Sequence, residues 1–124
     1  MRVLIVSEDP RERQRASTAL TLDDQIELVE VDSAAAARVE LARTPADVLV
    51  IDGDLTPKGG FSLLYELRAD AELEGVAAIP ALVMVQRETD QWLAKWARAN
   101  ATLPKPVDPF ALAKLVRALA STTA

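Results

Sequence analysis

Short, uninterrupted apolar runs constrain the fold of this chain more than any other feature. Three of them are Val3–Val6, Asp47–Ile51 (apolar from its second residue) and Ala81–Val85. Continuous apolar runs of this length are typical of strands that are buried on both faces. Stretches with helical spacing separate them, which predicts right-handed crossovers and a parallel sheet covered by helices on both sides.

The sequence predicts five strands that alternate with five helices in one domain, residues 1–124. The expected strands are Val3–Val6, Ile26–Val31, Asp47–Ile51, Ala81–Val85 and a short one at Ala101–Leu103. Three expected helices have both ends defined: Pro10 to Leu20, the N-cap Ser33 to Arg43, and Thr89 to Ala99. Another follows Gly59-Gly60 and carries Phe61, Leu64 and Leu67 at helical spacing. The last helix begins at Asp108-Pro109. Asp9 is the expected N-cap of the first helix, with Glu12 completing a capping box.

Polar residues follow three of these strands. Asp52 ends the third apolar run, Glu8 and Asp9 follow the first, and Lys105 lies between two prolines after the fifth. Ligands of open parallel sheets bind beyond the carboxyl ends of the strands, so these residues are expected on one rim. A carboxylate, further acids and one lysine predict an Asp–Mg²⁺–Lys site for a phosphoryl group. Asp9 fits a metal ligand and a simple helix cap equally well.

Two missing residue types exclude whole classes of chemistry. The chain has no histidine and no cysteine. A Ser-His-Asp triad and an imidazole base are therefore excluded, and zinc lacks its usual ligands. A metal in this chain must be bound by oxygen atoms, which favours Mg²⁺ or a similar hard cation.

Charge and hydropathy narrow the expected surroundings and partners. The formal net charge is -5, which argues against a nucleic-acid-binding surface. We see neither a stretch long enough to cross a membrane nor a secretory leader, and the lack of cysteine is compatible with a cytoplasmic location.

Three motifs make the chain similar to the receiver domains of two-component response regulators. They are Val6-Ser7-Glu8-Asp9-Pro10, Val50-Ile51-Asp52 with Gly60 at the expected distance, and Leu103-Pro104-Lys105-Pro106. The resemblance covers essentially the whole chain and is that of a stand-alone receiver without an output domain. It implies an α/β, flavodoxin-like (βα)5 fold, a doubly wound parallel sheet with strand order 2-1-3-4-5.

The resemblance also implies a function. Asp52 would accept a phosphoryl group from a sensor histidine kinase or phosphotransfer protein, and the chain would signal in a phosphorelay to a downstream protein target. Mg²⁺ would be held by Glu8, Asp9, Asp52 and the main-chain carbonyl of Asp54, while Lys105 would pair with the phosphoryl oxygens. The only expected catalysis is self-phosphorylation and autodephosphorylation on Asp52.

The chain departs from the family pattern at two places. Ser7 and Glu8 stand where the family has an acidic pair, which predicts weak Mg²⁺ binding. Gln86 and Thr102 stand where a switching hydroxyl and an aromatic residue are usual, so the ordinary switch is expected to be missing. A phosphorylation-independent pseudo-receiver that acts as an interaction module remains an alternative. A flavodoxin-like cofactor binder is a third, although the acidic loop after the first strand would repel phosphate.

Two tryptophans supply the candidate partner surface. Trp92 and Trp96 are four residues apart and therefore share one helix face. That face either packs on the sheet or binds a partner. If the face binds a partner, we expect a homodimer or a heteromeric partner docked on the last two helices and the fifth strand.

Overall fold

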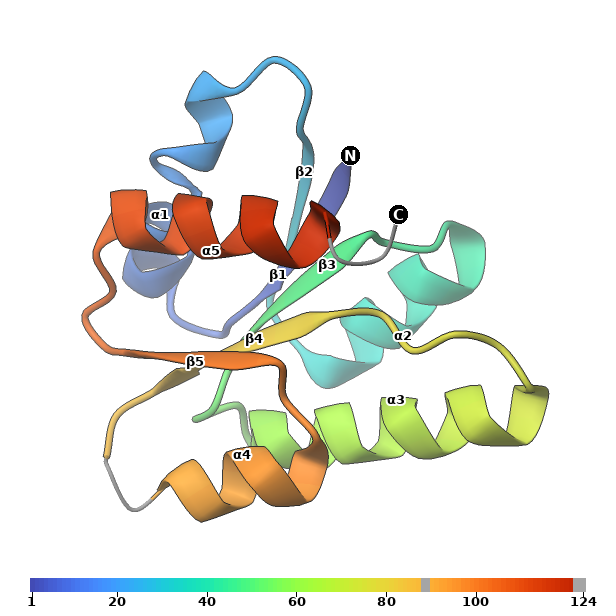
Figure 1. Ribbon diagram of the computed structural model, residues 1–124. Helices are drawn as coiled ribbons and strands as arrows, with labels where there is room; N and C mark the ends of the chain where they lie inside the picture. The colour runs from blue at the N-terminus through green and yellow to red at the C-terminus, as the bar shows by residue number, and fades with distance from the viewer. Residues whose placement is uncertain (88–89, 122–124) are drawn as a thin grey trace.

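Five parallel strands form one sheet, and helices cover both of its faces (Figure 1). The computed structural model describes residues 1–87 and 90–121. The strand order is β2-β1-β3-β4-β5, and all four strand pairs are parallel. The predicted flavodoxin-like topology is confirmed.

The strands are short and the helices vary in length. The strands are β1 Arg2–Val6, β2 Glu27–Val31, β3 Val48–Asp52, β4 Ala81–Val85 and β5 Ala101–Pro104. The helices are α1 Pro10–Ser17, a 3-10 turn Leu20–Leu22, α2 Ala34–Arg43, α3 Gly60–Glu74, α4 Gln91–Ala97 and α5 Pro109–Ser121. In the part of the chain that the structure describes, no helix has the length and apolar character needed to cross a bilayer.

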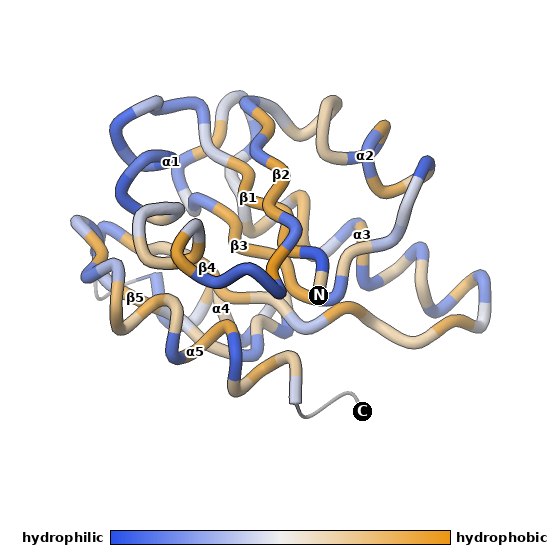
Figure 2. The backbone as a smooth tube through the Cα atoms, turned by 90° about the horizontal axis from the view of Figure 1, so that it is seen from above, coloured by the Kyte–Doolittle hydropathy of each residue, from blue (hydrophilic) through white to orange (hydrophobic). Residues whose placement is uncertain are grey.

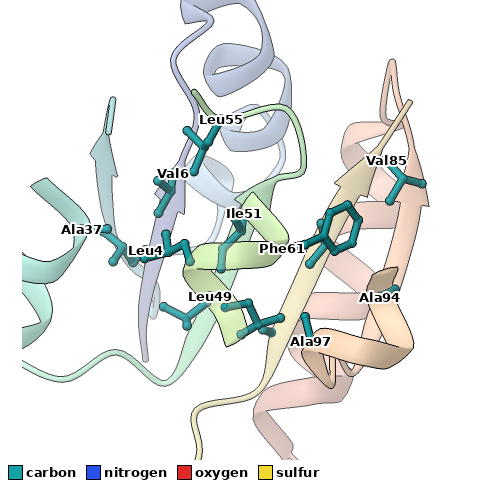
Figure 3. Close-up of a cluster of buried hydrophobic side chains, with 14 of the residues drawn as sticks. Leu4, Val6, Ala37, Leu49, Ile51, Leu55, Phe61, Val85, Ala94 and Ala97 are labelled. Carbon is teal, nitrogen blue, oxygen red and sulfur yellow. The ribbon is translucent and has the colours of Figure 1, made fainter. Parts of the chain in front are cut away.

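Successive side chains of the central strands point to opposite faces of the sheet and pack in two separate hydrophobic cores. Leu4, Leu49 and Val83 point toward α2, α3 and α4, and Figure 3 shows this cluster around Ile51 and Phe61. Their neighbours along the strands pack on the other face against α1 and α5, where the buried residues are Val3, Ile5, Val48, Val50, Leu82, Met84, Ala16, Leu20, Leu112 and Val116. Apolar strands at the centre and hydrophilic segments toward the outside are visible in Figure 2. Burial on both faces explains why these strands are apolar throughout.

Side-chain caps set the starts of three helices. Arg11 N donates to Asp9 Oδ1 over 2.9 Å at α1, Ala36 N to Ser33 Oγ over 3.0 Å at α2, and Phe110 N to Asp108 Oδ1 over 3.0 Å at α5. These three caps agree with the sequence prediction.

The predicted capping box at α1 is wrong. Asp9 N donates to Ser7 Oγ over 3.2 Å instead of to Glu12. Within the described residues, Glu12 Oε2 is buried and has no hydrogen-bond partner. In a capping box the Asp9 amide would donate to the Glu12 side chain. The turn after β1 instead places the Ser7 hydroxyl next to this amide, and the hydroxyl accepts its hydrogen bond.

Two helices are shorter than their apolar patterns predicted. α1 ends at Ser17 and a 3-10 turn replaces its expected last turn. α4 ends at Ala97 because Arg98 adopts a left-handed conformation with φ of 62°, which closes the helix. The predicted start of this helix at Thr89 lies outside the described residues.

Candidate functional site

The carboxyl ends of β1, β3 and β5 bring the candidate site together. Asp52 is the last residue of β3 and is only 4% exposed. Lys105 directly follows β5, and its Nζ lies 2.7 Å from Asp52 Oδ1. Lys105 N donates to Val85 O over 2.7 Å, which fixes the lysine backbone against the end of β4. The expected proximity of Asp52 and Lys105 on one rim is confirmed, while their chemical roles stay a prediction.

Three donors hold the Asp52 carboxylate. Oδ1 accepts from Lys105 Nζ and from Asp54 N, the latter over 3.0 Å. Oδ2 accepts from Ser7 Oγ over 2.8 Å. A buried carboxylate is costly unless its charge is paired and its oxygens are hydrogen-bonded, and these contacts satisfy both needs.

Lys105 bridges two carboxylates. Its Nζ also lies 2.7 Å from Asp54 Oδ2. Burial acts to lower the pKa of Lys105, but hydrogen bonds and charges from Asp52 and Asp54 outweigh it, so the pKa is raised. The lysine is therefore a permanent cation at physiological pH. The sequence prediction used only the main-chain carbonyl of Asp54 and missed this side-chain contact.

Ser7 is a site residue whose contact the sequence did not reveal. It is fully buried, and its hydroxyl donates to Asp52 while accepting from Asp9 N. Arg13 Nη1 donates to the Ser7 carbonyl over 2.6 Å, which adds a second link to α1. The sequence shows that Ser7 directly follows an apolar strand, but it does not show the direction of the Ser7 hydroxyl.

Glu8 turns toward the loop that follows β3. Its Oε1 accepts from Thr56 Oγ1 over 2.6 Å and from Thr56 N. The Thr56 hydroxyl, followed by the Thr56 amide, lowers the pKa of Glu8. Because Glu8 is exposed, this carboxylate remains accessible from solvent while it ties the β1 end to the β3–α3 loop.

The donor set suits a hard cation in its chemistry. Glu8, Asp9, Asp52 and Asp54 supply only oxygen atoms, which Mg²⁺ prefers. Among the described residues, however, no three acidic side chains form a group able to hold a metal ion. Asp9 Oδ1 caps α1, and Asp54 Oδ2 contacts Lys105. Any metal must therefore rearrange contacts that the protein already makes.

Gly60 places α3 against the end of β3. A Cβ at this position would lie 2.1 Å from Asp52 O and 2.7 Å from Ile51 Cγ2. Gly60 N donates to Gly53 O over 3.1 Å. Two adjacent glycines allow unusual backbone angles at both positions. Only Gly59 has a positive φ, 89°, whereas Gly60 is required for this close approach.

The two expected switch positions have different surroundings. Gln86 is exposed directly after β4. Thr102 on β5 exchanges hydrogen bonds with the side-chain amide of Gln91, with Nε2 donating to Oγ1 over 3.3 Å. This exchange links β5 to the first residue of α4.

Comparisons with known proteins agree with the fold and the motifs. The family model described as the response regulator receiver domain matches residues 3–117. An uncharacterized response regulatory protein of Mycobacterium tuberculosis strain H37Rv is 33% identical over 124 residues, covering 96% of this chain and 90% of the relative.

Solved structures show the same architecture. The receiver domain of Ssk1 from Saccharomyces cerevisiae, co-crystallised with the histidine phosphotransfer signaling protein Ypd1, matches with a TM-score of 0.88 and 17% identity, over 100% of this chain and 91% of that one. The chemotaxis response regulator CheY4 of Vibrio cholerae matches with a TM-score of 0.81 and 22% identity, over 95% and 97% of the two chains.

Proposed function

The chain belongs to the response regulator receiver family, and we propose that Asp52 is its phosphoryl acceptor. The observation that carries this proposal is the buried Asp52 carboxylate with Lys105 Nζ at 2.7 Å from Oδ1. As the last residue of β3, Asp52 lies at the rim of the sheet, where a donor can approach in line, and the sheet keeps its carboxylate in place.

The main barrier to phosphoryl transfer onto Asp52 is the repulsion between two anionic groups, so the site must neutralise negative charge. A carboxylate oxygen of Asp52 forms the new bond to phosphorus, while the bond from phosphorus to the donor nitrogen breaks and that nitrogen keeps the electron pair. Both reactants are anionic, so Lys105, held as a cation beside Oδ1, lowers their repulsion. Asp54 also holds the Lys105 ammonium group at the site, through its own 2.7 Å contact.

Mg²⁺ is the cofactor that we assign to this reaction. When bound, it would supply a second positive charge next to the incoming phosphoryl oxygens. Asp52, Glu8 and the main-chain carbonyl of Asp54 would hold it, with Asp9 as the further acid of the pocket. We expect weak affinity because Ser7 contributes no charge and Glu8 already binds Thr56.

We assign the donor role to a sensor histidine kinase or a phosphotransfer protein. The Ypd1 co-crystal supports this class of partner, since a receiver domain of the same fold was crystallised there with a phosphotransfer protein. The output of this domain is then a contact with a downstream protein. We place the chain in the cytoplasm, which its lack of cysteine permits.

Acetyl phosphate labelling tests the assignment. We expect intact mass to show one added phosphoryl group that depends on Mg²⁺, and Asp52→Asn to abolish it. Asp24→Asn is a matched control, because Asp24 is exposed in the turn before β2. Labelling that persists in Asp52→Asn would place the acceptor elsewhere and refute the proposal.

A phosphorylation-independent interaction module is the second candidate. The internal contacts of Ser7 and Glu8 favour it, because they satisfy the pocket without a metal. Beryllofluoride with Mg²⁺, which mimics a phosphoryl group, separates the two candidates. Saturable binding that Asp52→Asn abolishes supports the acceptor, whereas no binding at any Mg²⁺ concentration supports the interaction module.

A further inference from the structure

Three aromatic side chains form an exposed surface where α3 meets α4. Trp92, Trp96 and Tyr65 are 65%, 45% and 43% exposed. The rings of Tyr65 and Trp96 stack with centroids 4.3 Å apart and planes within 3° of parallel. Trp92 lies one turn before Trp96 on the same helix face. We call these residues, together with Lys95, the α3–α4 aromatic surface.

The tryptophans are exposed because α4 packs on the sheet through alanine. Ala94 and Ala97 are buried in the core, as Figure 3 shows. Small side chains let the helix approach the sheet closely and turn the indoles outward. Singly exposed apolar residues are ordinary, but a contiguous exposed aromatic cluster marks an interaction site.

The surface is held in shape by links between α3 and α4. The guanidinium of Arg68 is buried and donates to Arg98 O through Nε over 3.3 Å and through Nη2 over 3.1 Å. It also donates to Asn100 Oδ1 over 2.9 Å. Glu72 forms an ion pair with Arg98. A preformed surface loses little conformational entropy when a partner binds.

Helix α4 adds an exposed cation to this surface, although the chain as a whole is negative. Between Gln91 and Arg98 the sequence contains two cations and no acidic residue, although the net charge of the chain is -5. Arg98 is paired with Glu72. Lys95 is exposed, and within residues 1–87 and 90–121 it has no ion-pair partner. Lys95 lies between the two tryptophans in the sequence, so an anionic group of a partner would meet it beside the aromatic rings.

We propose that the α3–α4 aromatic surface docks an acidic amphipathic helix of a partner protein. The apolar face of such a helix would cover the three aromatic rings, and its carboxylates would pair with Lys95. Tryptophan and tyrosine are the residues that most often dominate the binding energy of an interface. The inference rests on the proposed function only in that the domain acts through protein contacts.

Charge excludes two other occupants. A second copy docked here by two-fold symmetry would present the same patch, whose one described acid opposite α4, Glu72, is already paired with Arg98 and offers Lys95 no free carboxylate. Stable binding of a nucleic acid needs several clustered cations, whereas in the described part of this surface Lys95 is the only cation without an ion-pair partner. An acidic helix is the occupant that satisfies both the aromatic rings and the lysine.

A pair of designed peptides tests the proposal. The first is a helix of about 18 residues with leucine at helical spacing on one face and glutamate on the other, and the second has lysine in place of glutamate. We expect the glutamate peptide to bind the unmodified chain and to shift tryptophan emission to shorter wavelength. Fluorescence anisotropy should show that Lys95→Glu and Trp96→Ala each weaken it by about 10-fold or more.

Two matched variants control for general effects. Lys114→Glu makes the same charge change on the exposed side of α5, and Leu73→Ser removes another exposed apolar side chain, on α3. Both should leave affinity for the glutamate peptide within about twofold, since surface changes away from a site have small effects. Equal weakening by Lys114→Glu and Lys95→Glu would overturn the assigned location.

Other results would also overturn the proposal. These are no binding of the glutamate peptide, equal binding of both peptides, and displacement of the glutamate peptide by single-stranded DNA. A dimer in sedimentation velocity that Lys95→Glu dissociates would assign the surface to a second copy. Peptide binding is measured on the Asp52→Asn variant as well. Unchanged affinity there separates this inference from any failure of Asp52 to accept a phosphoryl group.

Discussion

Gly60→Ala is expected to disturb both the stability of the fold and the position of Asp52. The added Cβ would lie 2.1 Å from Asp52 O and 2.8 Å from Asp52 C, and these are backbone atoms that no rotamer change can move. Overpacking of this kind costs about 3 kcal/mol at the upper end of its usual range. The higher helix propensity of alanine offsets at most about 1 kcal/mol of this loss in unfolding free energy. The net loss of unfolding free energy should be about 2 kcal/mol.

Gly75→Ala is the matched control for this substitution. Gly75 has φ of 69° and ends α3, and a Cβ there would have no neighbour within 4 Å. It should therefore lose only about 1 kcal/mol, the cost of a left-handed alanine. Urea unfolding of both variants measures the difference, and acetyl phosphate labelling should slow in Gly60→Ala alone. If Gly60→Ala is no less stable than Gly75→Ala, the close approach of α3 to Asp52 is wrong.

Three further predictions follow from single contacts. Ser7→Ala leaves Asp52 Oδ2 buried without its hydroxyl donor and should lower the free energy of unfolding by about 1–3 kcal/mol in urea titration. Arg68→Met keeps the apolar stem but removes the donors that link α3 to α4. It should lower the unfolding free energy by at least about 2 kcal/mol and shift tryptophan emission, and an unchanged spectrum would contradict the proposed link. The lowered pKa of Glu8 means that its contact with Thr56 stabilises the fold above the ordinary glutamate pKa of about 4.3. This stability is lost as pH falls through the lowered folded pKa, so Glu8→Gln and wild type should differ at neutral pH and converge in acid.

The topology and the position of the rim residues could be predicted because both follow from the order and the parallel direction of the strands. Continuous apolar runs mark strands buried on both faces, and alternation with helices makes these strands parallel. Parallel strands place their carboxyl ends on one edge. Asp52 and Lys105 were therefore expected to be neighbours, although 53 positions separate them in the chain.

Contacts within the site depend on loop conformation and could not be predicted in this way. The Ser7 hydroxyl reaches Asp52 because the turn after β1 directs it inward, and Glu8 reaches Thr56 because the β3–α3 loop folds back over the rim. Neither turn has a sequence pattern that specifies these side-chain directions. The close approach at Gly60 was missed for the same reason, since a glycine pair indicates conformational freedom without naming a neighbour.

The orientation of α4 shows a limit of helical periodicity. Ala94 and Ala97 form one apolar stripe, and Trp92 and Trp96 form another. Periodicity alone favours the larger side chains as the buried stripe. The structure buries the alanines instead, and Trp96 stacks on Tyr65 of α3 at the surface.

Helix α3 connects Asp52 to the α3–α4 aromatic surface. Gly60 lies against Asp52, and Tyr65 stacks on Trp96 five residues later, about 7.5 Å along the helix axis. A helix with its own hydrogen bonds moves as a unit, so any displacement of Gly60 would be carried to the stack by a route that does not use Gln86 or Thr102. We expect beryllofluoride to leave tryptophan emission nearly unchanged if the usual switch positions are the only route. A large, saturable emission change that Gly60→Ala abolishes would refute that expectation and identify α3 as the coupling element.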